Sequence, residues 1–283
     1  MPRVHLDQLA AAGRHYRYFS LDTMLQDQAL AGYKTIELIG WSPHLLMDEN
    51  GVLDVREVRR KAEEAELRIG AFVPEAGAYN YRLGQEDPEL SGRSRRYFAK
   101  ACEATRQLGA KVMLVSCLGG TYDQDSARVF GQTVRDLQQL SYAAQDCGIT
   151  LAVKTNAWNT ARVFNTLPEL VDLLAAVDST RVQACLDTIA MADAGETPTQ
   201  WFDALGGAIA HVQLDDGRPE GRLVWGDGLL PLERYLLELE DHGYRGLLGL
   251  APDDSRYLFD PNSADRRNLE ALRPYLCDGE AIA

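Results

Sequence analysis

Two charged side chains stand at the ends of apolar segments, where a charge is conspicuous. Lys154 closes the segment Gly148–Lys154 (GITLAVK) and is one of only five lysines among the 283 residues. Asp187 closes a second apolar segment, Val182–Asp187. A buried ammonium and a carboxylate can form a salt bridge; alternatively, burial lowers the pKa of the lysine, which then acts as a base or a Schiff-base nucleophile. We therefore take Lys154 and Asp187 as candidate catalytic residues and keep the salt bridge as the simpler interpretation.

Strand-like runs alternate with longer amphipathic patterns along the chain. The predicted strands are Arg3–Leu6, Thr35–Ile39, Arg68–Val73, Lys111–Cys117, Thr150–Lys154, Val182–Asp187, Ala208–Leu214 and Leu247–Leu250. Helical spacing of apolar residues predicts helices at Val55–Leu67, Arg93–Leu108, Asp123–Cys147, Leu167–Val177, Pro231–His242 and Ala264–Leu276. Several helices are expected to end just before a glycine: Gly32, Gly109, Gly148 and Gly243.

Eight strands alternating with helices at roughly thirty residues per unit predict repeated βα units. A (β/α)8 barrel of about 250 residues fits this length as one α/β domain over residues 1–283. A doubly wound open sheet is the alternative, but the chain lacks both an early G-x-G-x-x-G motif and a linker rich in proline and glycine.

Functional groups of such a barrel lie at the carboxyl ends of its strands. The period-two alternation of strand side chains then sorts the two faces. Leu151, Val153, Ala210 and Val212 are expected to face the helices. Four consecutive strands then end on the lumenal side in Lys154, Asp187, Gln213 and Ala251, which converge on one point.

Composition excludes several classes of protein. A net charge of -13, with 29 basic against 42 acidic residues, argues against nucleic-acid binding. No apolar run approaches the roughly 18–20 residues of a membrane span, and charges interrupt the first twenty residues, so neither a membrane segment nor a signal peptide is expected. Five scattered cysteines without a C-x-x-C pair are typical of reduced thiols. We expect a cytoplasmic protein.

Six segments, in order, resemble the sugar isomerase/epimerase superfamily with the xylose-isomerase-like barrel, closest to the fructoselysine, tagatose and hydroxypyruvate epimerase or isomerase types. They are AGYKTIELIGWSPH (Ala31–His44), FVPEAGAYNYRLG (Phe72–Gly84), GITLAVK (Gly148–Lys154), ACLDT (Ala184–Thr188), HVQLDD (His211–Asp216) and GYRGLLGLA (Gly243–Ala251). The resemblance covers nearly the whole chain. It implies a small carbohydrate as ligand and is compatible with a homo-oligomer.

In that family a divalent metal, often manganese, binds between a Glu, an Asp, a His or Gln, and a second Glu. The resemblance places these ligands at Lys154, Asp187, Gln213 and Ala251 of this chain. Hard divalent cations prefer several anionic oxygens, and this set offers one carboxylate beside an ammonium. We therefore expect no metal and no other cofactor, with Lys154 paired to Asp187 in its place. Should a metal bind, Asp187 with Asp216 is the expected surviving pair.

Other side chains are candidates for catalysis or for binding a sugar. Glu75, which follows Pro74, and Glu37 could each bind a sugar hydroxyl or act as a relocated base, or simply cap a loop. Asp215 and Asp216 follow the seventh predicted strand. The resemblance places a substrate lid at Pro74–Pro88. The candidate substrate-binding residues are Trp41, His44, Tyr79, Tyr81, Arg82, Trp158, His211, Gln213, Asp216 and Arg218; His211 could equally pack against the barrel wall.

Three functions remain open from the sequence. The first is an enzyme that acts on a small carbohydrate or keto-polyol without the family metal, with Lys154, Asp187 and Glu75 nearest the chemistry. The second is a non-catalytic barrel that binds a sugar or serves as a partner subunit. The third is a metal-dependent isomerase whose ligands have been relocated.

Overall fold

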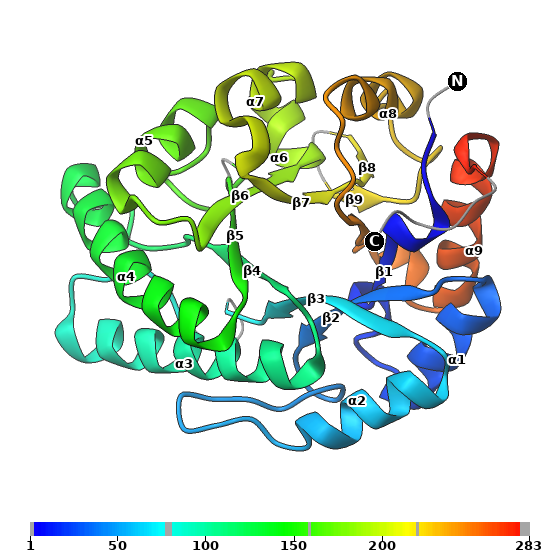
Figure 1. Ribbon diagram of the computed structural model, residues 1–283, viewed down its shortest axis with the longest axis horizontal. Helices are drawn as coiled ribbons and strands as arrows, with labels where there is room; N and C mark the ends of the chain where they lie inside the picture. The colour runs from blue at the N-terminus through cyan, green and yellow to red at the C-terminus, as the bar shows by residue number, and fades with distance from the viewer. Residues whose placement is uncertain (1–2, 77–80, 158–159, 219–220, 278–283) are drawn as a thin grey trace.

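Parallel strands close into a barrel in the computed structural model, which describes residues 3–76, 81–157, 160–218 and 221–277 (Figure 1). Within these residues the barrel contains eight strands, in the spatial order β1-β10-β7-β6-β5-β4-β3-β2. Their bounds are β1 (Leu9–Ala12), β2 (Thr35–Gly40), β3 (Arg68–Pro74), β4 (Val112–Ser116), β5 (Thr150–Lys154), β6 (Val182–Asp187), β7 (Ile209–Gln213) and β10 (Leu248–Leu250). The predicted single-domain (β/α)8 barrel is confirmed.

Helices form a ring around the strands (Figure 1). They are α1 (Leu21–Ala31), α2 (Val55–Glu64), α3 (Pro88–Leu108), α4 (Ser126–Cys147), α5 (Leu167–Val177), α6 (Thr188–Asp193), α7 (Pro198–Leu205), α8 (Leu232–Asp241) and α9 (Pro261–Leu272). As expected, α1, α3 and α4 end at glycines in the left-handed conformation: Gly32, Gly109 and Gly148. Among the described residues, no helix has the length and apolar character needed to cross a membrane.

The first strand lies later in the chain than predicted. Arg3–Leu6 is not a strand; Val4 makes only an isolated bridge to Leu276. The strand is β1, the fully buried run Leu-Ala-Ala-Ala, which pairs with β10 on one side and β2 on the other. A barrel strand is covered on both faces and is therefore a continuous apolar run, which β1 is and Arg3–Leu6 is not.

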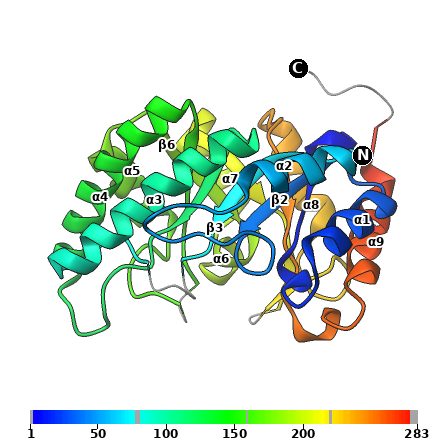
Figure 2. The same cartoon turned by 90° about the horizontal axis from the view of Figure 1, so that it is seen from below.

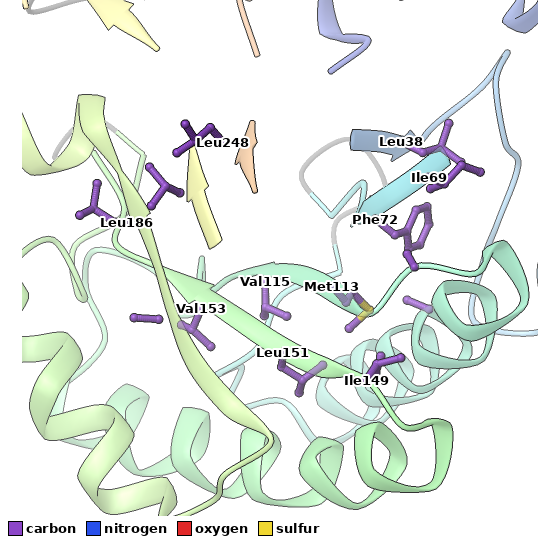
Figure 3. Close-up of a cluster of buried hydrophobic side chains, with 14 of the residues drawn as sticks. Leu38, Ile69, Phe72, Met113, Val115, Ile149, Leu151, Val153, Leu186 and Leu248 are labelled. Carbon is purple, nitrogen blue, oxygen red and sulfur yellow. The ribbon is translucent and has the colours of Figure 1, made fainter. Parts of the chain in front are cut away.

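The predicted division between outer and lumenal faces is confirmed for β5 and β6. Leu151, Val153 and Leu186 belong to the main core between strands and helices (Figure 3), while Ala152 and Cys185 belong to a smaller cluster inside the barrel. Ala210 is an exception. It packs against the lumenal cluster instead of facing the helices, because the register between β6 and β7 shifts by one residue after Ala184.

Two features define the functional end of the barrel. Helix α6 begins directly after β6 and lies at the lower rim in the side view of Figure 2, so this rim is the carboxyl end of the strands. After β7 the chain forms a short antiparallel hairpin, β8 (Asp216–Gly217) with β9 (Arg222–Leu223). The hairpin places Arg222 beside the ends of β5 and β6, where it contacts Asp187.

Candidate functional site

A cavity of about 740 Å³ opens at the carboxyl ends of the strands. This is the end of a barrel at which active sites are found. Its cationic lining residues are Arg14, Arg82, Lys154 and Arg222. Its acidic lining residues are Glu75, Asp187, Asp193 and Asp253. All three predicted catalytic residues, Lys154, Asp187 and Glu75, therefore meet in one cavity.

Asp187 is the centre of the charge cluster at the cavity floor. Its Oδ2 accepts from Lys154 Nζ at 3.2 Å and from the guanidinium of Arg222. Its Oδ1 accepts the amides of Ile189 and Ala190, which caps the start of α6. The salt bridge predicted between Lys154 and Asp187 is confirmed, but a second cation shares the same carboxylate oxygen.

Arg222 also joins this cluster to the end of β10. Its second nitrogen donates to Asp215 Oδ2 at 2.7 Å, and Asp215 Oδ1 accepts the Ala251 amide at 2.6 Å. Asp215 and Asp187 are each only 1% exposed. Two buried carboxylates and two cations thus alternate across the ends of β5, β6, β7 and β10, so each charge contacts an opposite one.

A buried hydrogen-bond network below the cavity fixes the orientation of Lys154. Glu37, on the lumenal face of β2, contacts His211 Nε2 and accepts from Gln213 Nε2, both at 2.8 Å. The side-chain oxygen of Gln213 must then face the other way, where it accepts from Lys154 Nζ at 3.2 Å. Lys154 therefore donates to two acceptors, Gln213 and Asp187, and its third N–H is left for the cavity.

The surroundings shift the pKa values of these groups in definite directions. Burial lowers the pKa of the Lys154 ammonium and Arg222 lowers it further, while Asp187 raises it. Burial alone would raise the pKa of Asp187, but Arg222 and Lys154 hold that pKa below its ordinary value. Burial raises the pKa of Asp215 to about 6, against the opposing effect of Arg222. The floor thus holds an ionised Asp187 between two cations.

The acid at Glu37 is ionised for a similar reason. Burial opposes its charge, but the hydrogen bond and charge of His211, with the Gln213 amide and Arg14, lower the pKa of Glu37 below its ordinary value. Glu37 and His211 are completely buried and do not line the cavity. They support the floor from beneath.

Several predicted substrate-binding side chains are held away from the cavity. The ring of His44 is buried and contacts the Phe19 carbonyl through Nε2 at 3.1 Å. The Tyr81 ring stacks on Tyr97 with centroids 4.0 Å apart, and its hydroxyl donates to Glu49. Trp41 does not itself line the cavity but lies beside it: it packs on the lumenal cluster, and the guanidinium of the cavity residue Arg14 is 6.0 Å from its ring centroid.

The loop after β7 contains two more of these candidates. Asp216 is buried, and its carboxylate accepts backbone amides from Gly217, Gly226, Gly228 and Leu230. It therefore organises the loop and does not face Asp187. Arg218 is exposed and does not line the cavity. Two other candidates, Tyr79 and Trp158, lie outside the described residues.

Sequence reasoning did not single out Arg14 or Arg222 as site residues and gave Asp215 no role. Arg14 begins a short 3-10 helix (Arg14–Tyr16) after β1, and Arg222 comes from the hairpin after β7. One signal was available: Gly217 and Gly221 lie shortly before Arg222, and two glycines so close together after a strand indicate a tight hairpin.

The described residues include no group of three or more His, Cys, Asp or Glu side chains arranged to hold a metal ion. Ala251 contributes no side-chain ligand at the end of β10, and Asp187 Oδ2 already contacts Lys154 and Arg222.

Comparison with known proteins assigns the fold to a family. Residues 25–275 match the model of the xylose isomerase-like TIM barrel. The chain belongs to this family. The resemblance to the sugar isomerase/epimerase superfamily is thereby confirmed.

The relatives are distant epimerases. Fructoselysine 3-epimerase of Escherichia coli O157:H7 is 22% identical over 262 residues, covering 92% of this chain and 95% of that protein. D-psicose 3-epimerase of Enterocloster bolteae is 28% identical over 211 residues, covering 69% of this chain and 65% of that protein. A crystal structure of D-psicose 3-epimerase in the presence of D-fructose has a TM-score of 0.77 at 18% identity, covering 94% of this chain and 97% of that one. This likeness supports the fold.

Proposed function

We propose that this protein binds a small carbohydrate or keto-polyol in the cavity and acts on it without the divalent metal of the family. The observation that carries the proposal is the ion pair between Lys154 and Asp187. It lies at the carboxyl end of the barrel, where the resemblance places two metal ligands, and it lines the cavity. An ammonium there supplies the positive charge that the metal would otherwise bring.

The donor set does not fit a divalent cation. Asp187 Oδ2 is shared by Lys154 and Arg222, and the end of β10 offers only a methyl group at Ala251. An ammonium about 4 Å from a divalent ion would cost on the order of 8 kcal/mol at an effective dielectric of about 20. Hard cations also need more anionic oxygens than one occupied carboxylate provides.

The cavity residues can perform proton transfer next to a carbonyl. Lys154 and Arg222 present N–H donors to a carbonyl oxygen, and the negative charge that develops there during enolisation is stabilised by the two cations. Glu75 lines the same cavity at the end of β3 and is the proposed base. It takes the proton from the neighbouring carbon while the electron pair moves to the carbonyl oxygen, which accepts a proton from Lys154. The adjacent hydroxyl then gives a proton back to Lys154 as Glu75 delivers its own proton to the former carbonyl carbon.

A single base limits the reaction. Epimerisation at one carbon by a two-base route needs an acceptor on each face, and Ala251 and Lys154 occupy the two positions where the resemblance places the family's glutamates. One base on one face suits transfer of a proton between adjacent carbons, which is an aldose–ketose isomerisation. The absence of both glutamates also supports a second candidate function, a non-catalytic barrel that binds a sugar without converting it.

Deuterium exchange separates these functions. The protein is incubated with a panel of ketoses and aldoses in D₂O, and exchange of the C–H next to the carbonyl is followed by NMR, alongside thermal-shift measurement of binding. If the protein is an enzyme, we expect deuterium exchange with the wild type and none with the Glu75→Gln and Lys154→Met variants. Thermal shift without exchange favours the non-catalytic barrel. If no sugar in the panel gives either deuterium exchange or a thermal shift, the proposal is refuted.

Manganese binding tests the placement of the site. Arg222 also forms a salt bridge with Asp187. Rebuilding the family's metal ligands therefore requires Lys154→Glu, Ala251→Glu and Arg222→Gln together. We expect the folded triple variant to bind about one Mn²⁺ per chain, measured by elemental analysis after dialysis, while Ala251→Glu alone does not. Stoichiometric Mn²⁺ in the wild-type cavity would overturn the metal-free proposal. A folded triple variant without Mn²⁺ would show that the site is misplaced.

A further inference from the structure

We infer that the ligand of the cavity is an anionic sugar, whose carboxylate or phosphate group binds among Arg14, Lys154 and Arg222, with Arg82 as a further cationic contact. This inference rests on the proposed function, because it names the substrate class of the same site. It goes further in one respect: the proposal above requires only hydroxyl and carbonyl oxygens, which a neutral sugar also has.

The three cations converge from separate parts of the fold. Arg14 follows β1, Lys154 ends β5 and Arg222 lies on β9, yet all three line one cavity. They are close enough to repel one another: Arg222 lowers the pKa of both Arg14 and Lys154, in addition to the effect of burial. A chain with a net charge of -13 thus gathers like positive charges at its cavity floor. An anion relieves this repulsion.

The carboxylates that pair with these cations are shared between them. Asp187 is shared by Lys154 and Arg222, and Asp215 also binds Arg222. Asp253 is shared by Arg17 and Arg14. Four cationic side chains therefore share the three carboxylates that form ion pairs with them.

Three further acidic residues lie in or beneath the cavity. Glu37 beneath the floor is bound by His211 and Gln213, and Asp193 is exposed at the end of α6. Glu75 at the end of β3 is half-buried and is the proposed base. Glu75 raises the pKa of Arg14 against the effects of burial and Arg222, and Arg82 lines the same cavity from the β3–α3 loop.

Hydrogen-bond donors without acceptors support the same conclusion. The Nε atoms of Arg14 and Arg82 are buried, and neither has a partner within the part of the chain that the structure describes. Lys154 uses two of its three N–H groups. Buried donors without acceptors are costly, and a carboxylate or phosphate oxygen satisfies them with charge-assisted hydrogen bonds. A cavity of about 740 Å³ has room for a hexose bearing such a group.

The test compares matched pairs of ligands that differ by the anionic group. Isothermal titration calorimetry, in a buffer free of phosphate, sulfate and carboxylates, would measure the affinity for each ligand. D-glucuronate is compared with D-glucose, and D-fructose 6-phosphate with D-fructose. We expect at least one anionic member to bind about tenfold to a hundredfold more tightly than its neutral partner, and added NaCl to weaken that preference. The pair that shows the preference distinguishes a carboxylate from a phosphate.

Matched variants locate the binding site. Arg82→Gln removes a cavity guanidinium that has no ion-pair partner among the described residues, so folding should be preserved, and Arg14→Gln removes one at the floor. Both should reduce the preference about tenfold, whereas Arg96→Gln, which removes an exposed charge from α3, should leave it unchanged. Equal losses in Arg96→Gln and Arg82→Gln would overturn the inference.

The two levels of the proposal fail differently. If neutral sugars bind as tightly as their anionic partners, the anionic ligand is wrong and the proposed function stands. If no sugar of either kind binds, both are wrong.

Discussion

The shared carboxylate of Asp187 predicts opposite consequences for its two neighbours. Asp187→Asn leaves Lys154 with only the Gln213 oxygen and places an amide NH₂ against two cationic donors. Removing one partner of a buried charge network costs about 3–5 kcal/mol. Lys154→Met keeps the length of the side chain, and Asp187 retains Arg222 and the amides of Ile189 and Ala190.

Lys154→Met should therefore cost no more than about 1–2 kcal/mol, mainly from the lost donor to Gln213. Part of that cost is offset because burial already disfavours the ammonium, as the lowered pKa of Lys154 shows. The gap of about 2–3 kcal/mol between the variants corresponds to a factor of roughly 30 to 150 in the unfolding equilibrium.

Equilibrium urea unfolding at pH 7.5, followed by tryptophan fluorescence, measures both variants on one scale. The slope of the transition must match that of the wild type, so that the midpoint reports stability. If Lys154→Met proves as destabilising as Asp187→Asn, then Arg222 does not stabilise Asp187 on its own, and the shared-carboxylate description is incorrect.

Two further predictions concern packing and pH. A Cβ at Gly249 would lie 2.4 Å from Glu37 Oε2, so Gly249→Ala should destabilise the protein by about 1–3 kcal/mol, whereas Gly207→Ala, with open space around it, should change little; equal midpoints in urea would contradict this. Glu49→Gln removes the acceptor of Tyr81 and should lower the melting temperature at pH 7. The hydrogen bond from Tyr81 contributes most to lowering the pKa of Glu49 to about 2. The stabilisation of the fold by ionised Glu49 is therefore present above about pH 4.5 and disappears as the pH falls toward 2. A difference in melting temperature between wild type and Glu49→Gln that persists at about pH 2 would refute this prediction.

The regular parts of the site could be predicted from the sequence. Lys154 and Asp187 end strands whose side chains alternate, so their convergence follows once the barrel is recognised. Gln213 was placed in the lumen for the same reason, and the structure joins it to Glu37 by a hydrogen bond. Period-two alternation failed at Ala210, because a single shift of register is invisible in the composition of a strand.

The irregular parts could not be predicted. Arg14 and Arg222 reach the cavity from a 3-10 turn and a two-residue hairpin strand, where no periodicity indicates direction. His44 and Tyr81 occur in segments that resemble the family's loops, but residue type does not reveal that a backbone carbonyl and Glu49 hold them elsewhere. Strand geometry is repetitive and therefore predictable; loop side chains depend on particular tertiary partners.

The sharing of one carboxylate oxygen between Lys154 and Arg222 also determines which substitutions the site tolerates. Loss of Lys154 leaves Asp187 paired with Arg222, whereas loss of Arg222 also leaves the buried Asp215 without its cation. A return toward a metal site is obstructed at each single step: Lys154→Glu alone sets a second carboxylate beside Asp187, and Ala251→Glu adds another at the strand end whose amide binds Asp215. Each single substitution leaves a charge without its partner, so building a set of metal ligands here requires several substitutions together.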